Sequence, residues 1–349
     1  MTLVFTICSS NYLAHAKVLG NSLAESNPDC RFVIGLVDCI PTEIDLPTWI
    51  SHEVIPVTEI GISDFHEMSE KYNIVELNTA AKPFYIDYFY KLDEAIDHVI
   101  YLDPDTVVYN SLLTLTDKLA SCNMIVTPHS CTYDDSETNM LYEISMLRTG
   151  VYNLGFLATA RSEETSCFLA WWQIRLRKYC YYLTSPGLFV DQIWIILAQV
   201  YFKGFCVEKD PGYNMCYWNH FERFLSFDQG CYWVNESHKL IVYHFSSYNP
   251  DHPNEINYRD DQPVATFQDR PDLKPLFDDY RKRLIEAGIN EVRSIECKLG
   301  LKPKAELSPE RSAKSFLKSL LSKSLGIMPK GVRKIVGRGA GSIMACCRD

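Results

Sequence analysis

Two aspartates separated by one residue, Asp103 and Asp105, directly follow a short apolar run, residues 99–102. The run predicts a buried strand, and Pro104 between the aspartates favours ending the strand there, because proline has no backbone donor. Side chains at positions i and i+2 of a strand lie on the same face. A pair of neighbouring carboxylates suits a hard divalent cation and the diphosphate that it neutralises. The alternative is an ordinary polar turn after a strand.

The elements that must position this pair alternate between strands and helices. Strand, helix and strand follow one another within about 40 residues at the start of the chain, which indicates a parallel βαβ unit. Open α/β sheets bind ligands at the carboxyl ends of their strands. The predicted strands are residues 3–8, 32–38, 54–57, 99–102, 124–128, 151–158 and 240–245. The predicted helices are residues 13–25, 79–92, 162–183, 190–201 and 272–287.

Composition places the chain among globular proteins and excludes a typical nucleic-acid binder. Its 349 residues are 47% hydrophobic and 22% charged, with a net charge of −10. That length allows a large core, and the negative charge argues against binding nucleic acid. The first apolar run is short and lacks a basic leader, so we expect no signal peptide. No apolar stretch approaches the length of a membrane span.

The 13 cysteines form no C-x-x-C pair and no pattern typical of a metal site. They are scattered through apolar segments, for example at Cys8, Cys122, Cys167 and Cys206. Free cysteine behaves as a small buried apolar residue, and disulfides are rare in the cytosol. We therefore expect reduced core cysteines and a cytoplasmic protein.

The end of the chain has a different composition. Residues 302–349 contain eleven Lys and Arg against three Asp and Glu, so residues 1–301 carry a net charge of −18. Apolar residues recur at helical spacing between Phe316 and Leu325, with lysines between them. This pattern predicts a basic amphipathic helix that contacts an anionic membrane surface. A helix docked on the main domain, with a solvated lysine face, is an equally weighted alternative.

Further polar residues occur in a fixed order around the aspartate pair. A polar loop follows the first strand, and a helix carrying a lone Lys82 precedes the aspartates. Residues 153–157 (NLGFL), the pair Asp191-Gln192 and a late His244 come after them. Over roughly residues 2–250, this order resembles the GT-A-fold glycosyltransferases, especially glycosyltransferase family eight and its bacterial relatives.

The resemblance implies an α/β fold of the GT-A (Rossmann-like) class, with a mostly parallel central sheet flanked by helices. A catalytic domain would span residues 1–301, and a C-terminal helical basic tail would span residues 302–349. The activity implied is that of a hexosyltransferase. It would move a sugar from a nucleotide-diphosphate sugar, in most relatives a UDP-sugar, to a hydroxyl of a glycan or lipid-linked acceptor. The resemblance favours retention of anomeric configuration. The cysteines predict a cytoplasmic location, and the basic tail predicts contact with the inner face of the membrane.

The same resemblance assigns a metal site. Asp103, Asp105 and His244 would hold Mn²⁺ or Mg²⁺, with Asp105 the most direct ligand and Asp103 also reaching the ribose of the donor. Mixed carboxylate and imidazole ligands suit Mn²⁺ better than Ca²⁺. The alternative for His244 is a hydrogen-bonded residue in a packed strand.

The remaining implied residues would bind the nucleotide-sugar. The base pocket would be lined by Thr6, Cys8, Ser9, Asn11, Tyr12 and, more weakly, Asp38. Lys82 would approach the diphosphate or sugar, and the alternative is a surface lysine. Asn153 would contact the sugar, and Gly155 would let the backbone approach it. Asp191 and Gln192 would lie near the reacting carbon, although an aspartate at a helix start is also a common cap.

One segment departs from the family pattern, which is H-x-x-G-x-K-P-W. Residues 244–251 read HFSSYNPD, so Ser247 stands at the glycine position, and the lysine and tryptophan are missing. In the family that lysine touches the diphosphate, so the phosphate contacts of this chain, Ser247 among them, must differ.

Two other functions use the same residues. A metal-dependent nucleotide-sugar hydrolase or phosphatase would need a nucleophile or a second metal cluster, and no obvious one is present. A non-catalytic GT-A-like binding protein is the other alternative, and the intact aspartate pair argues against it.

Overall fold

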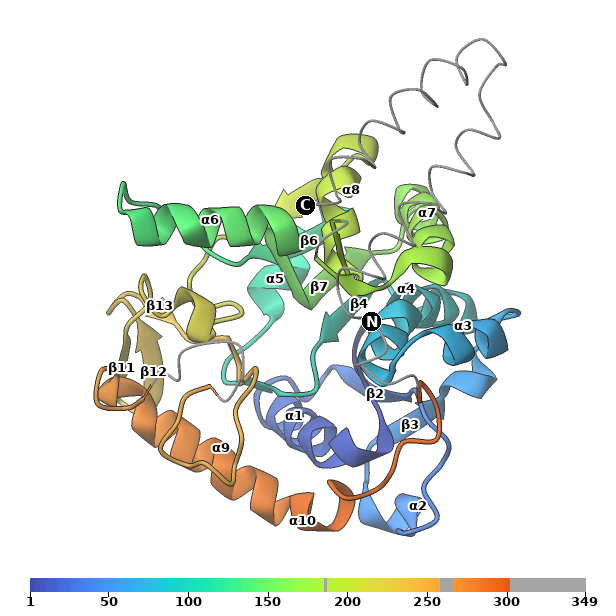
Figure 1. Ribbon diagram of the computed structural model, residues 1–349, viewed down its shortest axis with the longest axis horizontal. Helices are drawn as coiled ribbons and strands as arrows, with labels where there is room; N and C mark the ends of the chain where they lie inside the picture. Colours follow the sequence, from blue (N-terminus) through green and yellow to red (C-terminus); the bar gives the residue numbers. More distant parts are fainter. Residues whose placement is uncertain (185–186, 258–265, 302–349) are drawn as a thin grey trace, which may run out of the picture.

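The computed structural model describes residues 1–184, 187–257 and 266–301 (Figure 1). Its centre is a seven-stranded sheet with the strand order β10-β6-β7-β4-β1-β2-β3. The bounds of these strands are β1 Thr2–Cys8, β2 Arg31–Leu36, β3 Glu53–Pro56, β4 His98–Leu102, β6 Met124–Pro128, β7 Tyr152–Ala160 and β10 Phe205–Val207.

The sheet is mixed but mostly parallel. Strands β1, β2, β3 and β4 pair in parallel, and β10 pairs in parallel with β6. Only β7 runs against its two neighbours, β4 and β6. The carboxyl ends of the other six strands therefore share one edge of the sheet, which is where ligands bind in open α/β folds. The predicted mostly parallel α/β sheet is confirmed.

Helices cover both faces of the sheet (Figure 1). Successive residues of β1 point to opposite faces, as strand geometry requires. Phe5 packs in one core with α4 (Ile74–Leu92) and α7 (Glu163–Tyr179), and Val4 packs in another with α1 (Leu13–Ser26). An Asn73 capping box begins α4, and the Ser162 side chain caps α7, which satisfies backbone donors at both helix starts.

A short antiparallel pair lies beyond the aspartates. Strand β5 (Thr106–Val108) follows them and pairs with β14 (Val242–His244). The register opposes His244 to Thr106, and the N–H of Phe245 donates to the carbonyl of Asp105 at 2.8 Å. This pairing brings a segment more than 130 residues later in the chain to the end of β4.

The other elements complete the covering layers. The remaining α-helices are α2 Leu46–Trp49, α3 Phe65–Lys71, α5 Leu113–Lys118, α6 Glu137–Thr149, α8 Ile195–Tyr201, α9 Lys274–Glu286 and α10 Ile289–Val292. The short 3₁₀ turns are η1 Ser10–Tyr12, η2 Val57–Glu59, η3 Gln192–Trp194, η4 Tyr217–Asn219 and η5 Pro271–Leu273. The small strands are β8 Tyr182–Leu183, β9 Leu188–Phe189, β11 Leu225–Asp228, β12 Cys231–Val234 and β13 His238–Lys239.

Every predicted strand and helix between residues 3 and 287 has an observed counterpart, and most bounds agree within a few residues. The helix predicted at residues 190–201 instead begins as η3 and becomes α-helical at Ile195. Helix α6 was not predicted. The basic amphipathic segment at residues 302–349 lies outside the described residues. Within the described ranges, no helix combines the length and apolarity that crossing a membrane requires.

The expectation that all core cysteines are reduced is wrong for two of them. Cys122 and Cys206 form a disulfide across a sequence separation of 84 positions. Cys206 lies on the edge strand β10, and Cys122 lies just before its neighbour β6. Parallel pairing of these strands brings the two residues together, so the bond ties an edge strand to the sheet. Cys8 is free and buried, as expected, whereas Cys167 is free but exposed.

We predict that Cys122→Ser lowers the melting temperature. Closing a loop of this length contributes up to about 4.5 kcal/mol in the chain-entropy account. The control is Cys167→Ser, which changes an exposed free cysteine. Differential scanning calorimetry without reductant measures both variants. Equal melting temperatures for the two variants and the wild type would contradict a structural role for this disulfide.

Candidate active site

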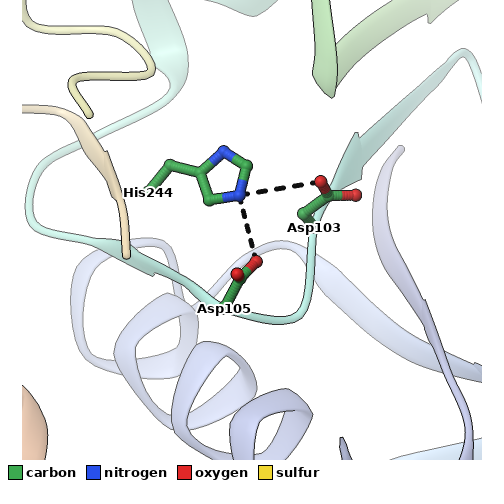
Figure 2. Close-up of side chains that lie close together, drawn as sticks. All are labelled: Asp103, Asp105 and His244. Carbon is green, nitrogen blue, oxygen red and sulfur yellow. Dashed lines mark ion pairs between the residues drawn. The ribbon is translucent and has the colours of Figure 1, made fainter. Parts of the chain in front are cut away.

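Three side chains that the sequence analysis grouped as metal ligands lie together at the carboxyl end of β4 (Figure 2). The Nε2 atom of His244 is 3.0 Å from Asp105 Oδ1 and 3.7 Å from Asp103 Oδ2. One ligand atom from each of the three lies within 4.8 Å of the others. His244 is buried, and the two carboxylates are partly exposed. We call these three residues the Asp-Asp-His cluster.

The close backbone approach predicted at Gly155 is observed at this cluster. The N–H of Asp103 donates to the carbonyl of Gly155 at 2.9 Å, which continues the β4–β7 pairing. A Cβ atom on Gly155 would lie 2.6 Å from His244 Cε1 and 2.8 Å from Asp103 Oδ2. Only glycine therefore leaves room for the cluster in this arrangement.

The charges within the cluster stabilise one another. Burial is the largest effect on His244 and lowers its pKa, but Asp105 and Asp103 together reverse this and raise the pKa above the usual value. Burial likewise raises the pKa of Asp105, and the charge and hydrogen bond of His244 bring it below the usual value. The cluster thus favours an ionised carboxylate facing a cation, the arrangement that a bound metal would also satisfy.

Two further residues fix the orientation of the ligands. The phenol of Tyr101, buried on β4, donates to Asp103 Oδ1 at 2.6 Å, so the other oxygen, Oδ2, faces His244. On the opposite side of the imidazole, His244 Nδ1 lies 3.3 Å from Asn214 Oδ1. A hydrogen bond at Nδ1 leaves Nε2 directed at the carboxylates, which is the usual way that proteins orient a ligating histidine.

Asn214 also begins a polar chain that leads away from the cluster. Its amide donates to Asn153 Oδ1 at 3.0 Å, and the Asn153 amide lies 3.4 Å from His129 Nε2. His129 Nδ1 lies 3.2 Å from the carbonyl of Val151. Burial lowers the pKa of His129 to about 4. A neutral His129 that donates from Nδ1 and accepts at Nε2 satisfies every contact in this chain.

The residues present fit a divalent metal. Two carboxylates and one imidazole provide oxygen and nitrogen ligands of the kind that suits Mn²⁺ or Mg²⁺. The absence of a side chain at Gly155 lets Asp103 and His244 approach the backbone without a clash. The hydrogen bonds from Tyr101 and to Asn214 supply the outer contacts that ligating residues usually have.

Lys82 and Asp191 form a buried ion pair beside the cluster. Lys82 Nζ is 2.5 Å from Asp191 Oδ2 and 2.7 Å from the carbonyl of Leu154, and it lies over the ring of Tyr101. Burial raises the pKa of Asp191, and the charge of Lys82 offsets only part of this. The surface-lysine alternative for Lys82 is wrong, since its side chain is 1% exposed. The Asp191 side chain makes no capping hydrogen bond, so the helix-cap alternative is also wrong.

The other residues predicted to contact the sugar and phosphates lie near this pair or near His244. Gln192 follows Asp191, and its amide donates to the carbonyl of Thr149 at 2.8 Å. Ser247 has a φ of +63°, a conformation that favours glycine. The backbone therefore keeps the shape that suits the family's glycine even though the residue here is serine.

The predicted base-pocket residues divide into buried and accessible groups. Thr6 and Cys8 are almost fully buried within β1, so their side chains do not reach solvent. Tyr12 is exposed and stacks on His15 with ring centroids 4.5 Å apart. Ser9 is buried and donates to the partly exposed Asn11. The nucleotide contacts of all these residues remain predictions.

Asp38 has a structural role as well. Its Oδ1 accepts from the N–H groups of Cys39 and Lys298, at 2.9 and 2.8 Å, and its Oδ2 accepts from Ser10 at 3.3 Å. The carboxylate thus fastens the segment around Lys298 to the ends of β1 and β2. The predicted contact of Asp38 with the nucleotide stays a prediction.

A cavity of about 740 Å³ lies next to the cluster. Asn153, Gln192 and Ser246 line it on the side of the predicted donor site, and Trp218, whose ring packs edge-on against His244 at 5.2 Å, lies in its wall. Residues of α6 line another part of the cavity. We call this space the α6 cavity.

The sequence analysis missed Tyr101, His129, Asn214 and Trp218 as site residues. His129 directly follows β6, as Asp103 follows β4, so the same strand-end argument identifies it. Tyr101 is two residues before Asp103, a spacing that places both side chains on one face of a strand. Asn214 and Trp218 lie in irregular segments, and no pattern in the sequence marks them.

The chain is similar to known glycosyltransferases in sequence. The model of glycosyl transferase family 8 matches residues 3–165, just under half of the chain. This match confirms the resemblance predicted from the motif order and supports a glycosyltransferase. Together with the observed mixed, mostly parallel sheet and its flanking helices, it confirms the predicted GT-A architecture.

Individual relatives are distant. The uncharacterized protein YfnF of Bacillus subtilis (strain 168) is 22% identical over 282 residues, which cover 80% of this chain and 92% of YfnF. The galactosyltransferase LgtC, solved with donor and acceptor sugar analogs, is 16% identical, with 85% of this chain and 98% of that chain covered and a TM-score of 0.42. The glycosyltransferase GlyE of Streptococcus pneumoniae TIGR4 is 15% identical, with coverages of 83% and 64% and a TM-score of 0.47.

We predict that Tyr101→Phe weakens Mn²⁺ binding by about tenfold, because outer contacts to metal ligands typically contribute 10–100-fold in affinity. Isothermal titration calorimetry with Mn²⁺ measures the change. Tyr90→Phe is the matched control, since it removes a phenol that bonds to Thr159 and touches no residue of the cluster. Equal metal affinity in the two variants would show that Tyr101 does not orient Asp103.

We also predict that Gly155→Ala removes metal binding, because the added methyl group would enter the cluster. Overpacking costs about 1–3 kcal/mol of folding stability in general. Gly35→Ala is the steric control, since a Cβ there would lie 2.8 Å from the ring of Tyr85, within the core. Both variants should lose stability, and only Gly155→Ala should lose Mn²⁺ affinity in calorimetry. Unchanged affinity in Gly155→Ala would contradict the assignment of this space to a metal.

Proposed function

Because residues 3–165 match glycosyl transferase family 8, we propose that this chain is a metal-dependent hexosyltransferase that uses a nucleotide-diphosphate sugar, a UDP-sugar in the first instance. The observation that carries this proposal is the Asp-Asp-His cluster at the carboxyl end of β4. The acceptor is a hydroxyl group of a glycan or of a lipid-linked sugar.

Asp103, Asp105 and His244 would hold a Mn²⁺ or Mg²⁺ ion. When bound, such an ion supplies Lewis-acid neutralisation of the donor's diphosphate. The chain's own contribution is to preorganise the site, since Tyr101 and Asn214 fix the ligand side chains before any donor arrives. Preorganised charge of this kind needs no rearrangement during the reaction.

Asp191, Gln192 and Asn153 would hold the hydroxyl groups of the donor sugar. Gln192 and Asn153 both line the α6 cavity, and Asp191 adjoins Gln192. Lys82 holds the Asp191 carboxylate in one position through the ion pair. We propose that Lys82 thereby acts on the donor sugar through Asp191, in addition to any contact with the diphosphate.

The reaction forms one bond and breaks one. The acceptor oxygen bonds to the anomeric carbon while the bond from that carbon to the diphosphate oxygen breaks, and the nucleoside diphosphate leaves with the electron pair. In a retaining reaction the acceptor proton passes to the departing diphosphate oxygen, so no protein base is needed. Two features of the α6 cavity support this route, since neither offers a strong base. Among its described lining residues Asp134 is the one carboxylate, and it lies on an exposed stretch. The imidazole of His129, with a pKa of about 4, is a weak base.

We propose a cytoplasmic location and contact of the basic tail with the inner face of the membrane. Because the Cys122–Cys206 disulfide is uncommon in the cytoplasm, the charge of the tail, and not the cysteines, supports this location. The tail's net charge of +8 supports attraction to anionic lipid, whereas the remainder of the chain, at −18, would be repelled.

We predict that Asp105→Ala lowers Mn²⁺-dependent UDP affinity by roughly 100-fold or more, since even outer contacts contribute 10–100-fold. Transfer should fall in parallel, and excess EDTA should stop the wild-type enzyme. Asp117→Ala, which removes an exposed carboxylate from α5, is the control. Wild-type turnover in Asp105→Ala or in EDTA would contradict metal dependence.

Incubation with donor alone separates the competing functions. A transferase should release free sugar far more slowly without an acceptor than it transfers sugar with one, whereas a hydrolase would release sugar rapidly. Metal-dependent UDP binding with no turnover of any donor would instead indicate a binding protein. The anomeric configuration of the product, measured by NMR, tests retention.

A further inference from the structure

The chemistry of the residues that line the α6 cavity limits which acceptors can bind there. Its volume of about 740 Å³ lies within the 300–1,000 Å³ range of small-molecule sites, so it has room for a molecule of drug size, such as a disaccharide. Its walls come from α6, from the segment that follows β6, from the β8–β9 hairpin and from the η4 region. None of these segments belongs to the Asp-Asp-His cluster.

The described lining is almost free of charge. It contains no lysine or arginine. Apart from tyrosines, its ionisable side chains are His129, which burial keeps neutral, and Asp134, whose side chain is exposed. A phosphate or carboxylate bound within the described walls would lose its hydration and find no counter-charge, which is costly.

The neutral part of the lining suits a carbohydrate. Hydroxyl and amide groups alternate with aromatic rings, which offer faces for the apolar C–H surface of a sugar. These groups include Ser136, Thr138, Ser145, Thr149, Trp218 and Phe221. Such a mixture of hydroxyl, amide and aromatic groups fits a molecule that is polar at its edges and uncharged.

Two polar atoms in this wall have no partner. Tyr142 Oη and Trp218 Nε1 are both buried, and neither makes a hydrogen bond in the described structure. A buried polar group without a partner is unfavourable. Both groups can donate a hydrogen bond, and the indole N–H can only donate. Both atoms have almost no exposed surface, so rotation of these side chains toward the cavity would let them donate to the oxygens of a bound sugar.

We propose that the α6 cavity binds the acceptor as an uncharged sugar of one or two rings, and that Tyr142 and Trp218 determine this specificity by donating to its oxygens. This inference rests on the proposed glycosyltransferase function and goes further, because it excludes acceptors whose reacting sugar carries a phosphate or carboxylate. In a lipid-linked acceptor, any phosphate must lie outside the described walls of the cavity.

The test measures sugar binding by saturation-transfer NMR on the full chain with UDP and Mg²⁺. The probes are matched pairs, methyl glucoside with methyl glucuronide, and lactose with a lactose phosphate. We expect at least one neutral probe to bind and its anionic counterpart to bind at least about tenfold more weakly. Anionic probes that bind as well as the neutral ones, or no binding by any probe, would overturn the proposal.

A variant of Tyr142 and a matched control test whether the neutral sugar binds in the α6 cavity. Tyr142→Phe should weaken binding of the neutral probe by about 3- to 10-fold, the net contribution of one hydrogen bond. Tyr133→Phe, which changes an 80% exposed tyrosine that does not line the cavity, is the matched control. Equal effects of the two changes would overturn the role of Tyr142.

A gain of binding offers a second check that does not depend on weakening the site. Ser145 is exposed on α6 and lines the cavity, so Ser145→Lys adds a cation with little risk to folding. It should raise the affinity for the anionic member of each pair, and no gain would contradict charge as the basis of exclusion. Metal-dependent UDP binding, measured separately by calorimetry, distinguishes the two levels of failure. If the wild-type protein shows no metal-dependent UDP binding, the proposed function is overturned. If it binds UDP with metal but does not prefer neutral sugars, this inference alone is overturned.

Discussion

Negative charge concentrated at the carboxyl edge of the sheet is the constraint on which the rest of the site depends. Asp103, Asp105 and Asp191 lie close together, and each has a different partner. Tyr101 donates to the first, His244 faces the second, and Lys82 pairs with the third. Carboxylates this close destabilise one another unless cations or donors offset them. Three carboxylates face one ammonium and one imidazole, and an imidazole that binds a metal is neutral, so the site has excess negative charge that a divalent cation would offset.

Much of the fold is predictable from the sequence because its strands are apolar runs bounded by polar turns. β4 and β6 are the clearest cases, since each is almost wholly buried and ends at a polar residue. Helix α6 was not predicted, and its burial pattern is the reverse of that of a typical core-facing helix. Leu141 and Leu147 are 60% and 69% exposed, while polar residues such as Ser145 line a cavity. The Cys122–Cys206 bond escaped prediction because strand pairing, rather than sequence spacing, brings the two cysteines together.

The Asp-Asp-His cluster was predictable because its members stand at strand ends in a fixed order, and strand ends converge on one edge of the sheet. The residues that orient the Asp-Asp-His cluster were harder to predict from the sequence. Asn214 contacts His244, 30 positions later in the chain, and its amide donates to Thr127 and Asn153 on two different strands. Such contacts depend on the three-dimensional path of loops, which local periodicity does not encode. Lys82 and Asp191 were each identified as site residues, but their ion pair, which joins positions 109 residues apart, was not predicted.

The departure from the family pattern at residues 244–251 affects which groups can neutralise the negative charge of a bound diphosphate. Ser247 keeps the φ of +63° that suits glycine, so the turn after β14 has the family's shape without its residue. The lysine expected two residues later, where Asn249 stands, is absent, and residues 244–251 contain no other lysine or arginine. Lys82, whose charge reaches His244, is already paired with Asp191. A diphosphate bound here would therefore depend on the divalent cation for neutralisation more than in a family member that has the lysine. Fewer fixed cations around the cluster make the metal ligands, and the residues that orient them, correspondingly more important.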